Sequence, residues 1–291
     1  SSECRISFAE YMEMALYHPR YGYYAANHGK IGAHGDFFTS PHLAVDFGEL
    51  LAKQFAEMWQ ILGQPHPFTL VEMGAGQGLL AADVLSGLQR QYPDCFAALE
   101  YVIVEKSAAL IAEQKQRLKS WQSEVKIEWR SLNEIPARSI VGCVFSNELV
   151  DAFPVHLVTL VDQVLQEVYV TVQSDEFVEV VGSLSTSRLT DYFDLNRIDL
   201  STPAYPDSYR TEVNLAALDW LSLTSDRIQR GYVVTIDYGY IATRYYNPRR
   251  SQGTLQCYYQ HSHHNNPYVN VGQQDITAHV DFTALERQGD R

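Results

Sequence analysis

The sequence predicts an α/β fold built on a doubly wound, Rossmann-like parallel sheet. Short apolar strands alternate along the chain with longer amphipathic patterns, which is typical of a parallel sheet covered by helices. A glycine-rich turn follows the first of these strands. With 291 residues, of which 46% are hydrophobic, the chain is long enough for one large domain with extensions or for two modest domains.

The elements of the sheet domain follow from their hydrophobic patterns. We expect parallel strands over residues 69–73, 100–105, 125–129, 140–146 and 231–237, with helices over 79–91 and 108–121. An amphipathic helix over 43–62 precedes the first strand, and apolar residues at helical spacing from Phe8 to Leu16 predict another near the start. We therefore expect an N-terminal helix and lid segment (1–42) and the first part of the core domain (43–154).

An insertion interrupts the sheet domain between its fourth and fifth strands. Residues 155–161, 164–172 and 177–181 alternate or run apolar with turns between them, as in an antiparallel meander, and helical patterns follow over 189–195 and 213–228. We predict an inserted antiparallel β and helical subdomain on the substrate side (155–230) and a second part of the core (231–291). Residues 258–272 are polar and are expected to form a loop.

The formal net charge of −13 argues against nucleic acid or an anionic membrane as the main partner, because both attract a basic surface. A basic peptide or protein would suit the chain better. No apolar run approaches the roughly 20 residues of a membrane-spanning helix, so no membrane insertion is expected, and no signal peptide is visible. The four cysteines form no CxxC pair and are expected to be reduced thiols: Cys4, Cys95, Cys143 and Cys257.

The glycine-rich turn reads Glu72-Met-Gly-Ala-Gly-Gln-Gly78. Such a turn lets the backbone approach a ligand closely, and the following helix offers its N-terminal N–H groups. Nicotinamide dinucleotide sites need GxGxxG, but Leu79 stands where that motif requires its last glycine, and no Lys-Ser/Thr pair of a P-loop follows. Gly74, Gly76 and Gly78 are therefore candidate nucleoside-binding residues, with a plain tight turn as the alternative.

Two carboxylates near this turn indicate which nucleoside binds. Glu72, two residues before Gly74, suits a cationic sulfonium that carries an amino acid tail. Glu105 closes the second strand, where a carboxylate can accept hydrogen bonds from both ribose hydroxyls. The spacing of the two acids fits one strand–helix–strand unit. The pattern predicts S-adenosylmethionine (SAM), held by Glu72, the three glycines and Glu105.

Polar residues also follow the fourth strand, in Ser146-Asn-Glu-Leu-Val-Asp-Ala-Phe-Pro154. Ligands bind at the carboxyl ends of strands in open α/β sheets, so Asn147, Glu148 and Asp151 are expected to face the methyl group as catalytic residues. A guanidinium acceptor has a pKa of about 13.8, and the two carboxylates could hold its charge on the non-reacting nitrogens by bidentate hydrogen bonds. Alternatively, Asp151 caps a following helix and Glu148 is a solvated turn residue. Asp237, which ends the last strand, either lines the acceptor pocket or satisfies backbone N–H groups.

Together these motifs resemble the family of the mitochondrial complex I assembly factor and its bacterial relatives (MidA-like), a group of SAM-dependent protein arginine methyltransferase-like proteins. The matching stretches span nearly the whole chain in the family order: 11–24 (YMEMALYHPRYGYY), 35–41 (GDFFTSP), 47–49 (FGE), 72–78, 146–154, 236–239 (IDYG), 253–255 (GTL) and 275–282 (DITAHVDF).

The resemblance implies a class I SAM methyltransferase fold in which residues 35–41 form part of a lid over SAM. The lid offers rings, hydroxyls and a carboxylate to a cationic ligand, although an ordinary loop has the same composition. Three lid residues are expected to contact the cofactor: Asp36, Thr39 and Ser40. Four other residues are expected at the rim of the substrate site: Asp237, Tyr238, Asp275 and His279. Two departures stand out: Gln77 replaces the usual arginine, and family members continue past Arg291, so two final strands would be missing.

We therefore predict methyl transfer from SAM to a protein acceptor, with arginine favoured. The resemblance implies a subunit of the respiratory NADH:quinone oxidoreductase as substrate, in the cytoplasm of a bacterium or the mitochondrial matrix of a eukaryote.

No metal site is predicted, because His261, His263 and His264 stand in a polar segment without further ligands. The alternatives are a non-catalytic SAM-binding assembly factor, a NAD-dependent oxidoreductase and a small-molecule methyltransferase. The sequence leaves open whether the chain forms a homodimer.

Overall fold

The computed structural model describes residues 5–26, 45–260 and 262–291, and the chain separates into two compact units. We name residues 27–149 and 223–236 the sheet unit, and residues 1–26, 150–222 and 237–291 the mixed unit. Each unit is discontinuous in sequence, because the chain passes from one to the other several times.

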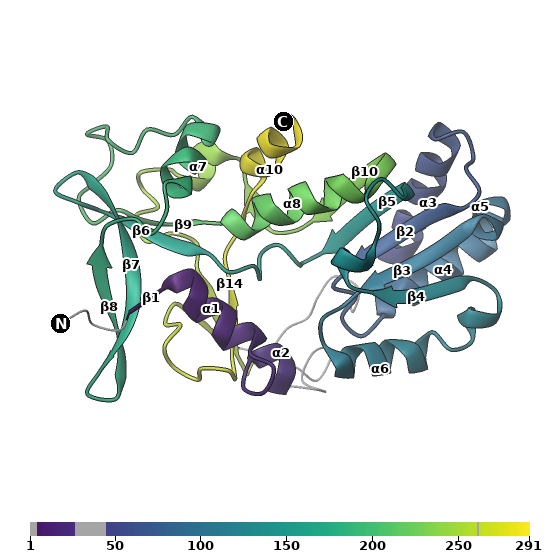
Figure 1. Cartoon of the computed structure of the whole chain (residues 1–291), viewed down its shortest axis with the longest axis horizontal. Coiled ribbons are helices and arrows are strands. Elements are labelled where there is room, and N and C mark those ends of the chain that lie inside the picture. The colour runs from purple at the N-terminus through teal and green to yellow at the C-terminus, as the bar shows by residue number, and fades with distance from the viewer. Residues whose placement is uncertain (1–4, 27–44, 261) are drawn as a thin grey trace. The chain divides into compact units, whose positions relative to one another are not determined.

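The sheet unit contains five parallel strands in the order β10-β5-β2-β3-β4 (Figure 1). Their bounds are β2 Phe68–Met73, β3 Leu99–Val104, β4 Lys126–Arg130, β5 Ile140–Asn147 and β10 Ile228–Ile236. From β2 the chain builds outward to β3 and β4 on one side, and later to β5 and β10 on the other. The switch point between β2 and β5 is where open α/β sheets bind ligands. This order confirms the predicted doubly wound α/β fold.

Helices α3 Val45–Ile61, α4 Leu79–Gln91, α5 Pro93–Ala97 and α6 Ala108–Arg117 complete the sheet unit. Apolar residues of α3 and α4 form one core with the strands. Within that core the Phe55 and Phe145 rings lie 4.8 Å apart, and Phe145 also meets Tyr101 edge to face. Burial of the central strands explains why they read as short apolar runs rather than as alternating patterns.

The mixed unit is built on an antiparallel sheet in which β7 pairs with β1, β6 and β8, and β6 pairs with β9. The bounds are β1 Ile6–Ser7, β6 His156–Val161, β7 Val164–Gln173, β8 Glu176–Gly182 and β9 Arg210–Val213. Asp162 and Gln163 join β6 to β7 with positive φ values of 51° and 60°, as a two-residue hairpin turn requires. The meander predicted from the alternating pattern is therefore present.

Two smaller sheets and several helices accompany this sheet in the described residues. The helices are α1 Phe8–Tyr17, α2 Tyr23–Ala26, α7 Arg188–Asn196, α9 Ala242–Tyr245 and α10 Phe282–Gly289. Helix α8 Leu215–Arg227 begins in the mixed unit, and its residues from 223 onward belong to the sheet unit. The small strands are β11 Gly239–Tyr240 with β15 Val280–Asp281, and β12 Gln256–Tyr259 between β13 Ser262–His264 and β14 Asp275–Thr277.

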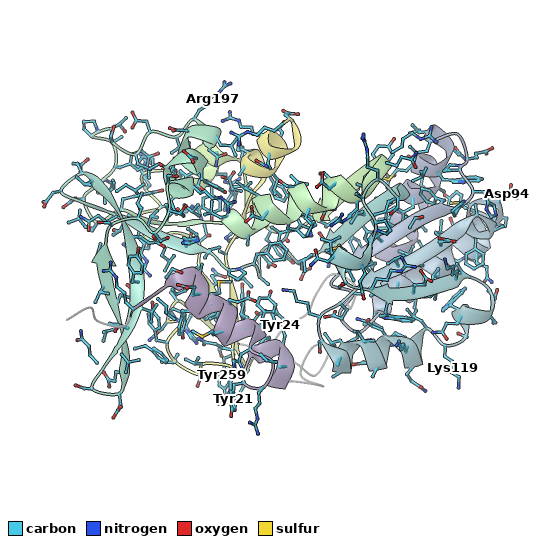
Figure 2. The ribbon with its side chains drawn as sticks, in the orientation of Figure 1. Tyr21, Tyr24, Asp94, Lys119, Arg197 and Tyr259 are labelled. Atoms are coloured by element: carbon cyan, nitrogen blue, oxygen red, sulfur yellow. The ribbon has the colours of Figure 1, made fainter. Side chains whose placement is uncertain are left out.

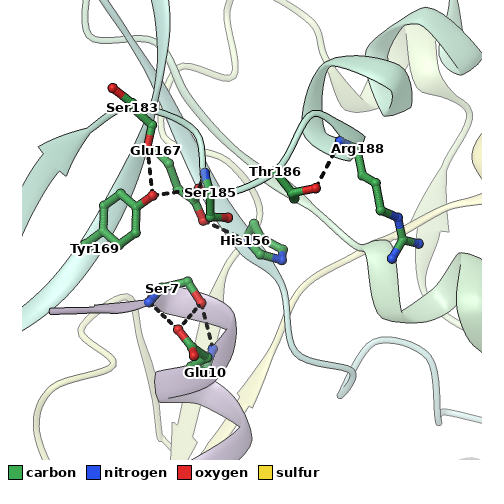
Figure 3. Close-up of polar contacts among 9 residues, drawn as sticks. All are labelled: Ser7, Glu10, His156, Glu167, Tyr169, Ser183, Ser185, Thr186 and Arg188. Atoms are coloured by element: carbon green, nitrogen blue, oxygen red, sulfur yellow. Dashed lines mark hydrogen bonds and ion pairs between the residues drawn. The ribbon is translucent and has the colours of Figure 1, made fainter.

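A buried hydrogen-bonded network fixes β7 of the mixed unit (Figure 3). Glu167 is fully buried, and its carboxylate lies 2.7 Å from His156 Nδ1 and accepts the Ser185 backbone N–H at 2.6 Å. Burial would raise the pKa of Glu167, but these hydrogen bonds outweigh it and hold the pKa below its usual value. Nearby, Ser7 and Glu10 form a reciprocal capping box that starts α1.

The structure divides the chain at other places than the sequence predicted. Residues 237–291 belong to the mixed unit rather than to a second part of the core, so only β10 returns to the parallel sheet. The N-terminal helix also joins the mixed unit, where β1 pairs with β7. Residues 258–272, expected to be a loop, begin with strand residues of β12 and β13. These strands have three or four residues, too few for an alternating pattern to be visible.

Candidate active site

The glycine turn of the sheet unit requires glycines for its backbone conformation. Gly74, Gly76 and Gly78 have φ values of 69°, 51° and 77°, in the left-handed region that other residues rarely adopt. A Cβ atom on Gly76 would meet no atom within 4 Å, so conformation rather than crowding selects glycine there. Gly74 N donates to Val104 O at 2.9 Å and joins the turn to the end of β3.

The strand registers bring the predicted cofactor residues to one edge of the sheet. Met73 is opposite Val104 of β3 and opposite Ser146 of β5. Because the strands are parallel, Gly74 and Glu105, which follow β2 and β3, and Asn147, the last residue of β5, lie at neighbouring strand ends. Their roles in binding and catalysis stay predictions, but the sheet unit provides the arrangement that those roles need.

Glu72 is a buried acid at the end of β2. Only 3% of its surface is exposed, and its carboxylate accepts a hydrogen bond from Tyr101 Oη at 2.6 Å. Burial raises the pKa of Glu72 to about 7, and the negative charge of Glu105 adds to the increase, whereas the Tyr101 hydrogen bond opposes it. A cationic amino group beside Glu72 would stabilise its ionised carboxylate and so offset the cost of burying that charge. The amino group in the amino acid tail of SAM fits this requirement.

Glu105 is held in place by the backbone that follows it. Its Oε1 accepts the N–H groups of Lys106 and Ser107 at 2.8 and 2.9 Å, and its Oε2 accepts Gln114 Nε2 at 3.4 Å. Burial raises the pKa of Glu105, and these three hydrogen bonds oppose that rise. A carboxylate oriented in this way can accept the hydroxyl groups of a ribose.

Two oxygens at the end of β5 match the donors of an adenosine with an amino acid tail. Ser146 Oγ and Asn147 Oδ1 are buried, and within the described part of the chain neither has a hydrogen-bond partner. Buried polar atoms are normally paired, and amino and hydroxyl groups of SAM can donate to such oxygens. With the glycine turn, Glu72 and Glu105, these residues fit the predicted cofactor.

Glu148 follows in an unusual conformation. Its φ is 49°, which is uncommon for a non-glycine residue, and its N–H donates to Ile236 O at 2.8 Å. Strained backbone of this kind is concentrated at functional sites. The observation supports the prediction that Glu148 takes part in the reaction.

In the mixed unit, two acids and three tyrosines form what we call the acidic tyrosine cluster: Tyr17, Tyr24, Asp151, Tyr258 and Asp275. Tyr24 (labelled in Figure 2) donates from Oη to Asp275 Oδ1 at 3.0 Å, and its ring stacks on Tyr17 with centroids 5.3 Å apart. Burial, and then the charges of Asp275 and Asp151, raise the pKa of Tyr24. Burial is also the main cause of the raised pKa of Tyr258, and the same two acids add to it. Carboxylates combined with aromatic faces suit a cationic group such as a guanidinium.

The structure assigns Asp237 a backbone-holding role. Its Oδ2 accepts the N–H groups of Val150 and Asp151 at 2.9 and 3.3 Å, and its Oδ1 accepts the N–H of Tyr238 at 2.8 Å. Of the two alternatives for Asp237, backbone satisfaction is therefore observed, and its place at a substrate rim stays a prediction. The alternative that Asp151 caps a helix is wrong, because the next element after its turn is strand β6.

His279 belongs to a different group of residues from Asp275. Its ring stacks on Tyr240 with centroids 5.0 Å apart, and its backbone N–H donates to Thr254 Oγ1 at 3.1 Å. Burial and the positive charge of Arg250 lower the pKa of His279. It is therefore poorly suited to carry a positive charge at neutral pH, whatever its place at a substrate rim.

The remaining predictions concern the lid residues, a metal site and membrane insertion. Asp36, Thr39 and Ser40 lie outside the described residues. His263 and His264 lie on β13, and no group of metal-ligating side chains forms within residues 5–26, 45–260 and 262–291. Among the described helices, none is long and apolar enough to cross a membrane.

Comparison with known proteins identifies the family. A family model described as "Putative S-adenosyl-L-methionine-dependent methyltransferase" matches residues 50–291. The chain belongs to this family. It is 34% identical to the "Protein arginine methyltransferase NDUFAF7 homolog, mitochondrial" of Drosophila melanogaster, with 95% of this chain and 65% of that protein covered. The human NDUFAF7 protein is 27% identical, with 97% and 65% covered. The chain therefore spans just under two thirds of the length of these relatives.

A solved structure supports both the fold and the cofactor of this methyltransferase family. A Burkholderia thailandensis protein, titled a "likely methyl transferase" and bound to S-adenosyl-homocysteine (SAH), matches with a TM-score of 0.87 and 32% identity. The match covers 98% of this chain and 72% of that one. Family membership confirms the resemblance inferred from the motifs, with SAM as the family's methyl donor.

The sequence patterns did not indicate two residues that contact the predicted cofactor residues, Tyr101 and Gln114. One signal was available for Gln114, which stands four residues after Leu110 and four before Leu118 on the buried stripe of α6. A polar residue in such a stripe indicates a buried hydrogen-bonding role. Nothing in the local sequence links Tyr24 to Asp275, because 251 residues separate them.

Proposed function

We propose that this chain transfers a methyl group from SAM to the guanidinium group of an arginine in a protein acceptor. The observation that carries the proposal is the shared sheet edge at which Glu72, the glycine turn and Glu105 meet the end of β5. The names of the fly and human relatives, both protein arginine methyltransferases, support the acceptor class.

The sheet unit supplies the cofactor residues of this proposal. Glu72 binds the amino group of the amino acid tail, the glycine turn approaches through its backbone, and Glu105 accepts the ribose hydroxyls. When bound, SAM supplies a methyl group on a positively charged sulfur. The protein's task is then to align the acceptor nitrogen with that methyl group and to exclude water.

Acceptor binding is the proposed task of Glu148 and Asp151, which stand three residues apart in the chain. A guanidinium must present one nitrogen with an available lone pair while its positive charge rests on the other two. Carboxylates achieve this by accepting bidentate hydrogen bonds from the non-reacting nitrogens. The charge and aromatic rings of the acidic tyrosine cluster support binding of a basic peptide, in agreement with the net charge of −13.

For the acceptor protein we propose a subunit of the respiratory NADH:quinone oxidoreductase, on the basis of the motif resemblance. The fly and human relatives are named as mitochondrial proteins. The mitochondrial matrix is accordingly the proposed location for a eukaryotic source, and the cytoplasm for a bacterial one.

The test uses purified protein, SAM with a deuterated methyl group, and an extract of cells that lack the gene. Mass spectrometry is expected to find labelled arginine in one or a few proteins. Glu148→Gln should reduce the initial rate by about a hundredfold, as expected for loss of a charged group that stabilises the transition state, while SAH affinity changes less than about twofold. Exposed Glu57→Gln is the matched control.

Two other outcomes would overturn the proposal. Label found only on residues other than arginine would contradict the acceptor. Tight SAH binding with no transfer to any protein, and unchanged partner capture by Glu148→Gln, would instead indicate a non-catalytic assembly factor that uses the nucleoside to stabilise a binding surface.

A further inference from the structure

Gln114 is a completely buried amide within the cofactor site of the sheet unit. Its Nε2 donates to Gly76 O at 2.7 Å and to Glu105 Oε2 at 3.4 Å, and its Oε1 accepts Trp129 Nε1 at 2.9 Å. One side chain therefore connects the glycine turn, the proposed ribose acid and strand β4.

The chemistry of its neighbours determines which way the amide points. An indole N–H can only donate, so the atom that faces Trp129 must be the amide oxygen. The NH₂ group must then face Gly76 O and the Glu105 carboxylate, both of which only accept when the acid is ionised. Trp129 thus reinforces the orientation, because a reversed amide would place its NH₂ group against the indole N–H as well as its oxygen against the two acceptors.

Helix α6 holds the turn at a second point one helical turn further on. Arg117 Nε donates to Gln77 O at 2.8 Å, next to the carbonyl that Gln114 binds. The stem of Gln114 also packs close to the turn, since a Cβ atom on Gly78 would lie 3.3 Å from Gln114 Cγ. The third glycine therefore makes room for Gln114 in addition to adopting its left-handed conformation.

We propose that Gln114, oriented by Trp129, is a positioning residue for SAM: its NH₂ group fixes the Glu105 carboxylate relative to the glycine turn. This inference rests on the SAM site of the proposed function. Two backbone N–H groups already occupy Glu105 Oε1, so Gln114 determines how Oε2 is presented to the ribose.

Calorimetric titration of SAH into the intact protein tests the inference. Gln114→Leu, which fits the apolar stripe of α6, should weaken SAH binding about tenfold through loss of a hydrogen bond to a charged group. Trp129→Phe, which keeps the ring and removes the N–H, should weaken it about threefold. Trp121→Phe is the matched control: this ring packs on Phe96 in the same unit, and its substitution should leave affinity unchanged.

The pH dependence separates positioning from a merely structural effect. Removing the Gln114 donor disfavours the ionised form of Glu105, so SAH affinity of Gln114→Leu should begin to fall at a higher pH on acidification than that of the wild type. The inference would be overturned if the wild type binds SAH and both variants, Gln114→Leu and Trp129→Phe, bind it with the same affinity as the wild type at every pH. Failure of the wild type itself to bind SAH would instead overturn the cofactor site on which it rests.

Discussion

At the scale of single residues, the proposed cofactor site depends on two acids, Glu72 and the partly buried Glu105, whose protonation the fold influences. Glu72 and Glu105 both have raised pKa values because burial disfavours their charged forms. The sequence indicated both acids from their places beside the glycines and at a strand end. It could not indicate Tyr101 as the partner of Glu72, because that contact depends on two strands being neighbours in the sheet.

The raised pKa of Glu72 predicts how stability changes with pH. Its pKa is about 7 in the folded protein against an ordinary 4.5, so between these values the folded state retains a proton that the unfolded chain has lost. Stability without SAM should therefore fall as pH rises through this window, by on the order of 3 kcal/mol at most. Glu72→Gln should abolish this contribution and be more stable than the wild type at pH 8.

Urea unfolding of both proteins at a series of pH values from 5 to 8 measures the difference. The two free energies of unfolding should be similar at pH 5 and diverge toward pH 8. Parallel curves would show that Glu72 has an ordinary pKa in the folded protein.

At the scale of elements, the Gly253-Thr-Leu255 motif shows how a short segment supports a buried charge. Glu212, on β9, is 1% exposed and accepts the backbone N–H groups of Thr254 and Leu255 at 2.9 to 3.0 Å. Gly253 has a φ of 74°, and a Cβ atom there would lie 2.1 Å from Glu212 Oε1. The family motif is therefore explained by an internal carboxylate in the mixed unit.

Gly253→Ala should destabilise the protein strongly, because it displaces the Glu212 carboxylate from its hydrogen bonds in addition to straining the backbone. We expect a loss of about 3 kcal/mol or more. Gly63→Ala is the matched control: its φ is 79°, but its added Cβ meets nothing within 4 Å, so strain alone should cost about 1 kcal/mol. Chemical denaturation measures the free energy of unfolding of both variants. Equal losses of stability in Gly253→Ala and Gly63→Ala would contradict this explanation of the motif.

The elements themselves were predictable to different degrees. Strands β2, β3 and β5 follow from runs of apolar residues because most of their side chains are buried, and helices α4 and α6 follow from their helical period. Strands β4 and β10 were also predicted from their apolar residues, although these are only partly buried. The short strands β11 to β15 were missed, because they have two to four residues and pair with partners that the local sequence does not reveal.

At the scale of the whole molecule, the chain forms two discontinuous units, and the residues proposed for cofactor binding and for acceptor binding are divided between them. The sequence predicted an insertion between the fourth and fifth strands, but it could not show that the N-terminal helix and the last 55 residues, 237–291, join the same unit. Long-range pairing decides this arrangement, as in the pairs of β1 with β7 and of β11 with β15. The proposed cofactor residues lie in the sheet unit, and the acidic tyrosine cluster lies in the mixed unit.

Hydrogen exchange of the intact chain with and without saturating SAH tests most directly whether the nucleoside is held between the glycine turn and Glu105. Exchange should slow in residues 74–79, in residues 105–107 and in α6, by up to about a hundredfold at a hundred times the Kd. Strands β6 to β8 should be unaffected and serve as the internal control. Protection confined to the mixed unit, or no protection at the glycine turn although SAH binds, would contradict the account.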